Sequence, residues 1–173
     1  AGFVEDDPNN SFEFFGLGTS AHFFEVPAGT KVARWSLFNE FTDGNDDLDL
    51  YVYRCIAFSC SFVDSSGNFD SNESVTLKLP EPAEGLFVTG DLYIVFVHGW
   101  QTDGPDANYL LFNWLVDADA ANMTVTAPAS AVQGGTGTVD VAWGGLDAGE
   151  KYLGAISHSD AIDLRELTLI SVE

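Results

Sequence analysis

The chain has 173 residues and carries 27 acidic residues against 6 Lys and Arg, which gives a formal net charge of -21. Nucleic-acid phosphates need basic side chains to neutralise them, so this charge excludes a nucleic-acid-binding protein and argues equally against anionic membrane surfaces. The chain is 46% hydrophobic and contains 14 Phe. That is enough apolar area for a folded core, which excludes an intrinsically disordered protein.

The single methionine, Met123, lies far from the start of the chain. We therefore expect a processed product or an excised fragment. The first residues do not show the pattern of a signal peptide, a basic start followed by an apolar stretch. No apolar run reaches the roughly 18 residues that cross a bilayer. We expect a monomer without a nucleic-acid or membrane partner.

The first two thirds of the chain predict a series of strands separated by Gly, Pro and Asn turns. In chain order these strands are residues 19–26, 31–38, 47–53, 61–64, 73–79, 92–97 and 108–117. Residues 47–53 alternate, so Leu48, Leu50 and Val52 face one way and the acidic and Tyr residues the other. The run 92–97 is apolar throughout, which is typical of a central strand covered on both faces.

Residues 73–79 alternate in the same way, with Val75, Leu77 and Leu79 predicted to point inward. No segment of a dozen residues sustains a helical period. The pattern predicts an all-β protein, an antiparallel β-sandwich of jelly-roll or immunoglobulin-like type.

The composition changes near residues 117–121, after which aromatic residues become fewer. We place a sandwich in residues 1–120 and a small β-rich segment in residues 121–173. The strands expected in this segment are residues 123–127, 139–143, 151–157 and 167–172. Four short strands are marginal as an independent domain, so we expect the segment to pack against the first.

The two cysteines, Cys55 and Cys60, enclose four residues. A redox pair normally has two intervening residues, and a structural zinc site needs further Cys or His nearby. A local disulfide that closes a hairpin fits the spacing best and implies an oxidising compartment. Two free, half-buried thiols are the alternative.

Several of these segments together resemble one bacterial family. The matching stretches are Phe23–Thr30, Asp47–Val52, Glu73–Leu77, Leu92–Trp100 and Ala107–Leu111. In order and spacing they resemble the pre-peptidase C-terminal (PPC) domain, over about residues 10–117. The chain departs from that pattern at the Cys55–Cys60 loop and in the long connection 81–90.

The C-terminal segment, through Val139–Trp143, Tyr152–Ile156 and Thr168–Val172, looks like the last part of some secreted subtilisin-like serine proteases. The resemblance implies a non-catalytic accessory domain of a secreted, extracellular bacterial protease. Such a domain assists export, stability or substrate binding. Its partners would be the upstream protease domain of the same polypeptide and a protein or polysaccharide substrate. A stand-alone, calcium-dependent carbohydrate- or protein-binding module is the alternative.

A catalytic site in this chain is not favoured. Gly18-Thr19-Ser20-Ala21 is similar to the nucleophile motif of subtilisin-like proteases, but that motif starts a helix, whereas a strand pattern follows Ser20. The Asp and His segments of that family are absent. His22, His98 and His158 are far apart in the sequence, which favours neither a metal trio nor a nucleophile–base pair. We expect Ser20 to be an ordinary strand serine.

The best candidate site is an acidic loop, because calcium prefers closely spaced carboxylate and amide oxygens on a Gly-containing turn. Its candidate ligands are Asp43, Asn45, Asp46, Asp47, Asp49 and Asp103, with Asp106 as a further helper. The loop is no EF-hand, because Leu48 and Arg54 occupy the positions of the obligatory Gly and Glu. Two interpretations stay open: a sandwich-type calcium loop, or a turn capped by Asp46 and Asp47 with Asp49 facing solvent. We expect no other cofactor.

A second hypothesis is an aromatic binding surface, because exposed aromatic rings bind sugars and proteins. The candidates are the four tryptophans, Trp35, Trp100, Trp114 and Trp143. Three of them lie in or at the ends of predicted strands, which favours packing in the core. Trp100 follows His98-Gly99 and precedes a turn. We therefore expect Trp100 to be the exposed one and a candidate binding surface.

Overall fold

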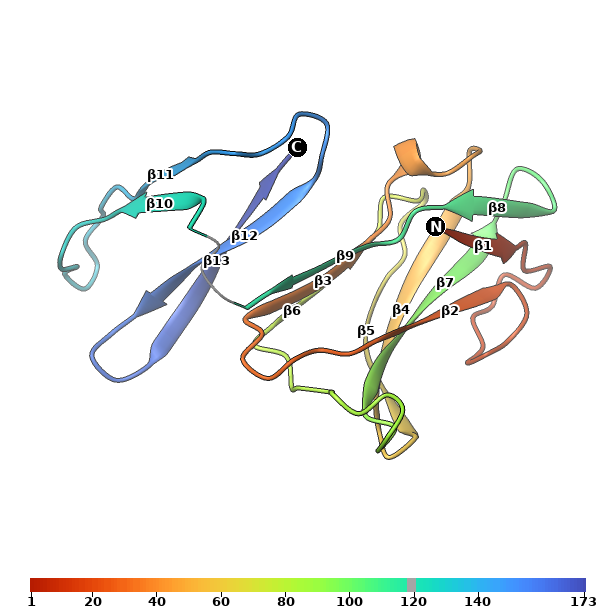
Figure 1. The fold of residues 1–173 in the computed structure, drawn as a ribbon. Helices are drawn as coiled ribbons and strands as arrows, with labels where there is room; N and C mark the ends of the chain where they lie inside the picture. The colour runs from red at the N-terminus through yellow and green to blue at the C-terminus, as the bar shows by residue number, and fades with distance from the viewer. Residues whose placement is uncertain (118–120) are drawn as a thin grey trace. The chain divides into compact units, whose positions relative to one another are not determined.

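The computed structural model describes residues 1–117 and 121–173 and forms two compact units, Ala1–Leu115 and Val116–Glu173 (Figure 1). The predicted boundary after residue 120 adjoins residues 118–120, which lie outside the described residues. In the described ranges the paired strands are antiparallel, and the helical structure is one 3-10 turn, η1 (Asn39–Phe41). No helix in those ranges has the length and hydropathy that crossing a membrane requires.

Two main sheets build the first unit. The four-stranded sheet has the order β2 (Thr19–Phe24), β7 (Leu92–Gln101), β4 (Asp47–Ile56) and β5 (Ser59–Ser66). The three-stranded sheet has the order β6 (Ser74–Lys78), β3 (Val32–Ser36) and β9 (Phe112–Val116). A third, two-stranded sheet joins β1 (Gly2–Glu5) to β8 (Asp106–Tyr109). The two main sheets share one core, which confirms the predicted antiparallel β-sandwich.

The core forms because both sheets turn an apolar face inward. Leu48, Leu50 and Val52 of β4 are fully buried, as the alternation predicts. They belong to the same cluster as Trp35 of β3 and Tyr93 of β7, whose ring centres lie 5.7 Å apart. Removal of this apolar area from water is the main stabilising contribution, at roughly 25 cal/mol per Å².

Strand β7 is a central strand and is buried on both faces, as its apolar run predicts. It pairs with β2 on one side and with β4 on the other. Val95 and Val97 belong to the core between the sheets, whereas Ile94 and Phe96 belong to a second hydrophobic cluster on the outer face of the sheet. The outer side of β7 is therefore covered rather than open to solvent.

Two sequence expectations for the first unit are wrong. Residues 108–117 form two strands rather than one, because the chain leaves β8 at Tyr109 and enters β9 in a different sheet at Phe112. Leu79 is exposed instead of inward, because β6 ends at Lys78 and the chain turns there. Leu79 takes a positive φ of 50° and its N–H donates to the carbonyl of Lys31 at 2.8 Å.

The sequence also gave no signal for β1. This strand has four residues, too few for a visible alternation, and it exists because β8 pairs with it in the register Val4↔Ala107. Both of these side chains are fully buried. Its pairing places the segment that follows, residues 6–18, against the first unit.

The second unit consists of two hairpins. One pairs β10 (Met123–Thr126) with β11 (Asp140–Trp143), and the other pairs β12 (Tyr152–Ser159) with β13 (Leu164–Val172). These strands confirm the predicted β structure of the segment. Among the described residues of this unit, Leu167 is the one fully buried hydrophobic side chain. The second unit is therefore held together largely by the backbone hydrogen bonds within its two hairpins.

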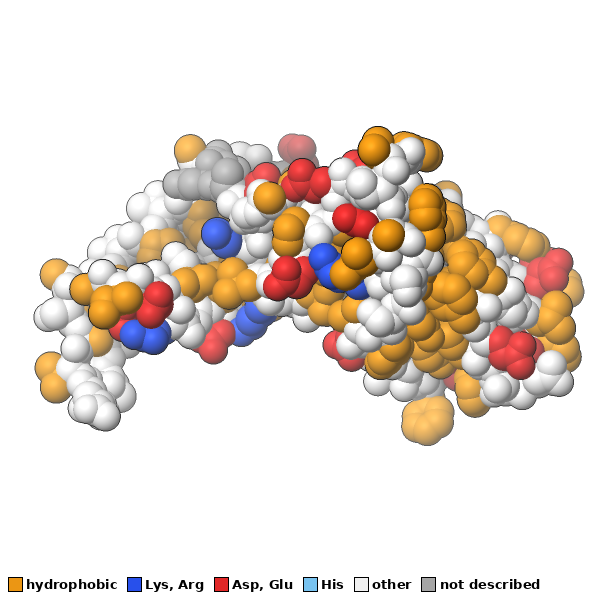
Figure 2. Space-filling view, turned by 90° about the horizontal axis from the view of Figure 1, so that it is seen from below, with side chains coloured by type: hydrophobic (Ala, Val, Ile, Leu, Met, Phe, Trp, Pro, Cys, Tyr) orange, Lys and Arg blue, Asp and Glu red, His pale blue; other side chains and the backbone are white. Residues whose placement is uncertain are grey.

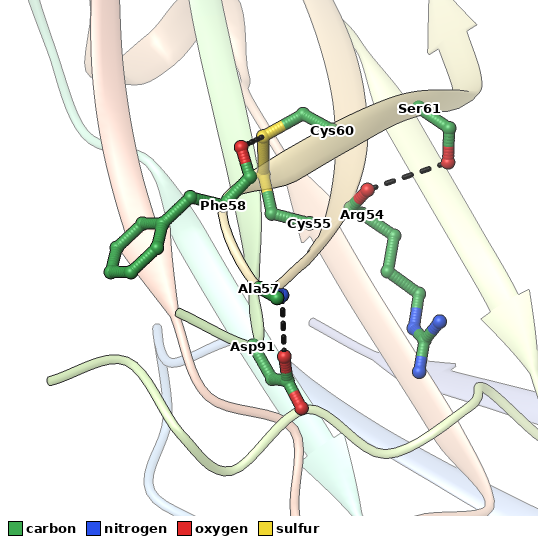
Figure 3. The surroundings of a disulfide bond; sticks show 7 residues. All are labelled: Arg54, Cys55, Ala57, Phe58, Cys60, Ser61 and Asp91. Carbon is green, nitrogen blue, oxygen red and sulfur yellow. Dashed lines mark hydrogen bonds between the residues drawn. A yellow bond between two sulfur atoms is a disulfide. The ribbon is translucent and has the colours of Figure 1, made fainter. Parts of the chain in front are cut away.

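A disulfide joins Cys55 of β4 to Cys60 of β5, as the spacing predicts (Figure 3). The two cysteines are register partners, and the chain between them reverses through Ala57 and Phe58. Both residues have positive φ, 48° and 64°, where a two-residue hairpin usually places Asn and Gly. The Ala57 N–H donates to the Asp91 carboxylate at 2.8 Å. The disulfide and this hydrogen bond hold a turn that its own residues disfavour.

Replacement of both cysteines by Ser should lower the free energy of unfolding by about 2 kcal/mol, because the closed loop that restrains the unfolded chain is short. Urea unfolding of the wild-type and double-variant proteins measures this difference. Wild-type protein in excess reductant is the matched control and should behave like the variant. Equal stabilities of all three samples would contradict a stabilising disulfide.

Candidate functional site

The outer face of β4 and β7 in the four-stranded sheet is covered by the segment between β1 and β2, residues 6–18, which we call the strap. The ring of Phe12 in the strap stacks on Tyr51 of β4, with centres 3.8 Å apart and an interplanar angle of 13°. Phe12 also meets the edges of Phe96 and His98 of β7. The strap thus places an aromatic layer over the sheet where simple alternation predicts water.

The strap is tied to the sheet at both ends by Gly99 of β7. The Asp7 N–H donates to the Gly99 carbonyl and the Gly99 N–H donates to the Gly18 carbonyl, each at 2.9 Å. A Cβ on Gly99 would lie 2.5 Å from the carbonyl oxygen of Glu5. Glycine is therefore required where the end of β1 passes over β7.

Five neighbouring rings, two from the strap and three from the sheet, form a row across the sheet that we call the aromatic strip. Its members, in spatial order from β2 to β5, are Phe23, Phe15, Phe14, Tyr53 and Phe62. Successive ring centres lie 6.5, 4.8, 4.8 and 5.6 Å apart. Each ring contacts the next, so the strip is continuous across the sheet.

The four Phe residues of the strip are 43 to 55% exposed. Figure 2 shows hydrophobic side chains gathered over one side of the first unit. A contiguous exposed apolar surface of this kind is uncommon on a protein that has no partner. The strip is therefore the principal candidate for a binding surface.

Trp100 lies on the same face of β7 as Phe96 and His98. Its ring centre is 5.9 Å from that of His98, and Asn10 of the strap donates from Nδ2 to its carbonyl at 2.5 Å. Trp100 is 37% exposed, which is less than Trp143 at 49%. The expectation that Trp143 packs in a core is wrong, because β11 belongs to a two-stranded hairpin.

Beneath the strap, His98 is fully buried between two carboxylates. Its Nε2 lies 2.9 Å from Oδ2 of Asp7, and its Nδ1 lies 3.7 Å from Oδ2 of Asp49. The second distance is too long for a hydrogen bond, so Asp49 acts through its charge. The Tyr51 hydroxyl donates to the same Asp49 oxygen at 3.2 Å.

Burial opposes a charge on His98, but the attraction of Asp49 and Asp7 outweighs it and raises the pKa of His98. Burial also acts on Asp7, in the direction of a higher pKa. The N–H groups of Asn9 and Ser11 and the ring of His98 donate to its carboxylate and lower the pKa of Asp7 overall. The pair is thus an ion pair that fixes the strap to β7.

The prediction that Asp49 faces solvent is wrong. Asp49 is buried, because the strap covers its side of β4 and the Tyr51 ring beside it lies under Phe12. The structure therefore assigns Asp49 to the histidine network, where its carboxylate faces His98 and Tyr51.

The rest of the predicted acidic site is gathered where the loop 43–47 meets the turn 102–106. The Asn45 N–H donates to the Asp103 carboxylate at 3.0 Å, and the Asp103 N–H donates to Asp46 at 3.1 Å. Asp43 accepts from the backbone and the side chain of Asn108, both at 2.7 Å. Asp106 belongs to β8, in the register of Glu5.

Two carboxylate oxygens here are buried without a hydrogen-bond partner, Oδ2 of Asp46 and Oδ1 of Asp47. Burial, assisted by the charges of Asp103 and Asp43, raises the pKa of Asp46. Burial and the charges of Asp49 and Asp70 raise the pKa of Asp47. Within the described ranges no three His, Cys, Asp or Glu side chains are grouped so as to hold a metal ion. Calcium binding stays a prediction.

The three histidines lie in separate places. His22 is hydrogen-bonded to the Tyr109 hydroxyl at 2.7 Å, His98 to Asp7, and His158 to Thr168 at 2.9 Å. Ser20 lies in β2, in the register of Val97. It is a strand residue, as its surroundings in the sequence predict.

Sequence reasoning missed the strap and a buried carboxylate. The strap follows a strand that gave no signal, and its Phe residues show neither a helical nor a strand period. Glu73 is fully buried, where it accepts hydrogen bonds from the Ser66 hydroxyl and from the Asn68 N–H. Burial raises the pKa of Glu73. One signal was present: three Phe residues, Phe12, Phe14 and Phe15, lie within four positions directly after the polar stretch Asn9-Asn10-Ser11.

Comparison of the chain with protein-family models, with curated proteins and with solved structures finds no match. Two features remain as candidates for function, the exposed aromatic strip and the acidic loop.

Asp7→Asn should lower the free energy of unfolding at pH 5 by about 3 kcal/mol, because it leaves a buried charge on His98 with a poorer partner. The raised pKa of His98 stabilises the fold fully below its ordinary pKa of about 6.5, and this stabilisation is lost as the pH rises through the raised value. The wild-type stability should thus fall as the pH rises above about 6.5, and the variant should show a flatter profile.

Urea unfolding across this pH range measures both effects. Glu13→Gln, which removes an exposed strap charge, is the matched control and should follow the wild-type profile. Parallel profiles of Asp7→Asn and the wild type would show that the His98 pair does not anchor the strap.

Proposed function

We propose that this chain is a non-catalytic accessory domain of a secreted bacterial subtilisin-like serine protease and that it retains the protease on its substrate. The observation that carries the proposal is the aromatic strip. It combines exposed apolar rings with rigid support, because Phe23, Tyr53 and Phe62 stand on three strands of one sheet. Binding surfaces gain affinity when their aromatic anchors are already ordered before binding.

The disulfide supports the secreted part of this proposal. Stable disulfides form in oxidising compartments, and the Cys55–Cys60 bond closes a turn with two disfavoured residues. The large negative charge suits solubility outside the cell. The resemblance of residues 10–117 to PPC domains supports the protease as the parent, with the catalytic domain upstream in the same polypeptide.

The upstream reading frame of the gene tests the parentage, because a protease catalytic domain should immediately precede Ala1. The full-length polypeptide then tests the role. Deletion of residues 1–173 should reduce its retention on insoluble protein substrate by about tenfold, with little effect on kcat/KM for a short soluble peptide. An equal loss on both substrates would contradict a retention role.

The point variants Phe14→Ser and Phe62→Ser, combined in the full-length protein, should reproduce the loss of retention. Phe69→Ser is the matched control, because Phe69 is fully exposed and lies outside the strip. A double variant that is retained like the wild type would remove the strip as the binding surface.

A second candidate function, calcium binding by the acidic loop, is favoured by the unpartnered buried oxygens of Asp46 and Asp47. Buried carboxylate oxygens without donors are costly, and a divalent cation satisfies both their charge and their lone pairs. Asp46 and Asp47, with the neighbouring Asp43 and Asp103, are the residues that would supply oxygen ligands. Calcium would then stabilise the junction of the loop 43–47 with the turn 102–106.

Millimolar calcium should raise the melting temperature of the isolated chain by about 3 °C, because a ligand that binds the folded state stabilises it. Asp46→Asn should abolish this response, whereas Asp64→Asn, an exposed acid on β5, should retain it. Scanning calorimetry with and without calcium measures the shift. An unchanged wild-type melting temperature at millimolar calcium would end the metal hypothesis.

A further inference from the structure

We infer that the aromatic strip binds an extended segment of polypeptide that carries both basic and aliphatic side chains. This inference rests on the proposed function, because it names the class of substrate that the same surface retains. Three observations lead to it: the mutual orientation of the rings, the charges around them and the span of the strip.

The ring orientations favour a polypeptide over a polysaccharide. The planes of Phe14 and Phe15 are inclined at 84°, those of Phe14 and Tyr53 at 62°, and those of Tyr53 and Phe62 at 74°. A sugar chain stacks on ring faces that are nearly coplanar from one unit to the next. Phe15 and Phe23 are closer to parallel, at 26°. From Phe15 to Phe62, however, faces and edges alternate, which leaves recesses between rings for aliphatic side chains and ring faces for cations.

The charges around the strip select a basic partner. Glu13 is exposed between Phe12 and Phe14, and Glu25 follows Phe23 by two residues and so leaves β2 on the same side. The Glu25 carboxylate accepts from the N–H of Leu86, which packs on the outer-face cluster. Two acidic groups thus lie near the rings: Glu13 on the strap, and Glu25 just beyond the end of β2.

None of the basic side chains of the first unit shares this face. Arg34 and Lys78 lie on β3 and β6 of the other sheet, and Lys31 precedes β3. Arg54 alternates with Tyr53 on β4 and donates to the Pro82 carbonyl at 3.0 Å. A basic partner therefore meets attraction from nearby carboxylates without a competing cation, and an acidic partner meets repulsion.

The span of the strip matches a short extended peptide. The strip crosses from β2 to β5, which is three strand spacings of about 4.8 Å, or roughly 14 Å. An extended chain rises about 3.3 Å per residue, so roughly four residues cover this distance. A segment of this length places two side chains against the rings, with the neighbouring side chains available to Glu13 and Glu25.

The test measures binding of capped octapeptides to the full chain by titration calorimetry at physiological salt. The probe is a peptide of alternating Lys and Leu. Two matched peptides replace either Lys by Glu or Leu by Ser, and cellohexaose represents a neutral polysaccharide. We expect the Lys–Leu peptide to bind at least tenfold more tightly than each of the other three probes.

The variants locate the binding. Phe14→Ser combined with Phe62→Ser should raise the Kd of the Lys–Leu peptide about tenfold, and Phe69→Ser should leave it unchanged. Neither substitution alters the net charge, so diffuse attraction to an acidic protein stays constant across the series. A melting curve of the double variant checks that the sandwich is intact.

Three outcomes would overturn the inference. Equal binding of the Lys–Leu and Lys–Ser peptides, with no effect of the double variant, means diffuse charge attraction only. Binding of cellohexaose that the double variant abolishes means that the strip takes sugars. Binding of no probe means that the partner belongs to another class. In the last two cases, a separate experiment tests the proposed retention function. It compares how strongly insoluble protein substrate retains the full-length wild type and the full-length Phe14→Ser/Phe62→Ser variant.

Discussion

The outer surface of the sandwich depends on one buried ion pair, between Asp7 of the strap and His98 of β7. A histidine at this depth is costly when charged, and Asp7 and Asp49 together offset that cost. The pair acts with the two backbone hydrogen bonds of Gly99, which hold both ends of the strap. These contacts hold Phe12 on Tyr51. Without them, the outer face of β4 and β7 would be exposed to water.

The covered outer face explains why this sandwich has two hydrophobic layers. The first lies between the sheets and includes Leu50 and Trp35, and the second lies beneath the strap and includes Phe96. The strap does not complete the second layer. Its rings join Phe23 and Phe62 at the surface, so the covering of the sheet also creates the exposed strip. Under the proposed function, stability and binding therefore depend on the same segment.

The acidic residues serve different purposes according to their surroundings. Asp7 and Asp49 are held beside a cation, Asp43 is satisfied by Asn108, and Asp46 and Asp47 each keep a buried oxygen without a partner. In the sequence, Asp43, Asp46, Asp47 and Asp49 form one acidic stretch, and Asp7 lies far from it. Only the folded chain distinguishes the ion-paired carboxylate of Asp49 from its neighbour Asp47, because the partner of Asp49, His98, lies on a strand far away in the sequence.

The sequence by itself determined the β class, most of the strands and the inward faces of β4, and it favoured the Cys55–Cys60 disulfide over free thiols. Alternation, turn residues and short spacings are local properties. Only the tertiary structure decided the burial of Asp49 and His98, the split between β8 and β9, and the assembly of the aromatic strip. Each of these depends on contacts between segments that are far apart in the chain. The pairing of β1 with β8 brings the strap onto the sheet, and no local pattern in residues 1–18 encodes that pairing.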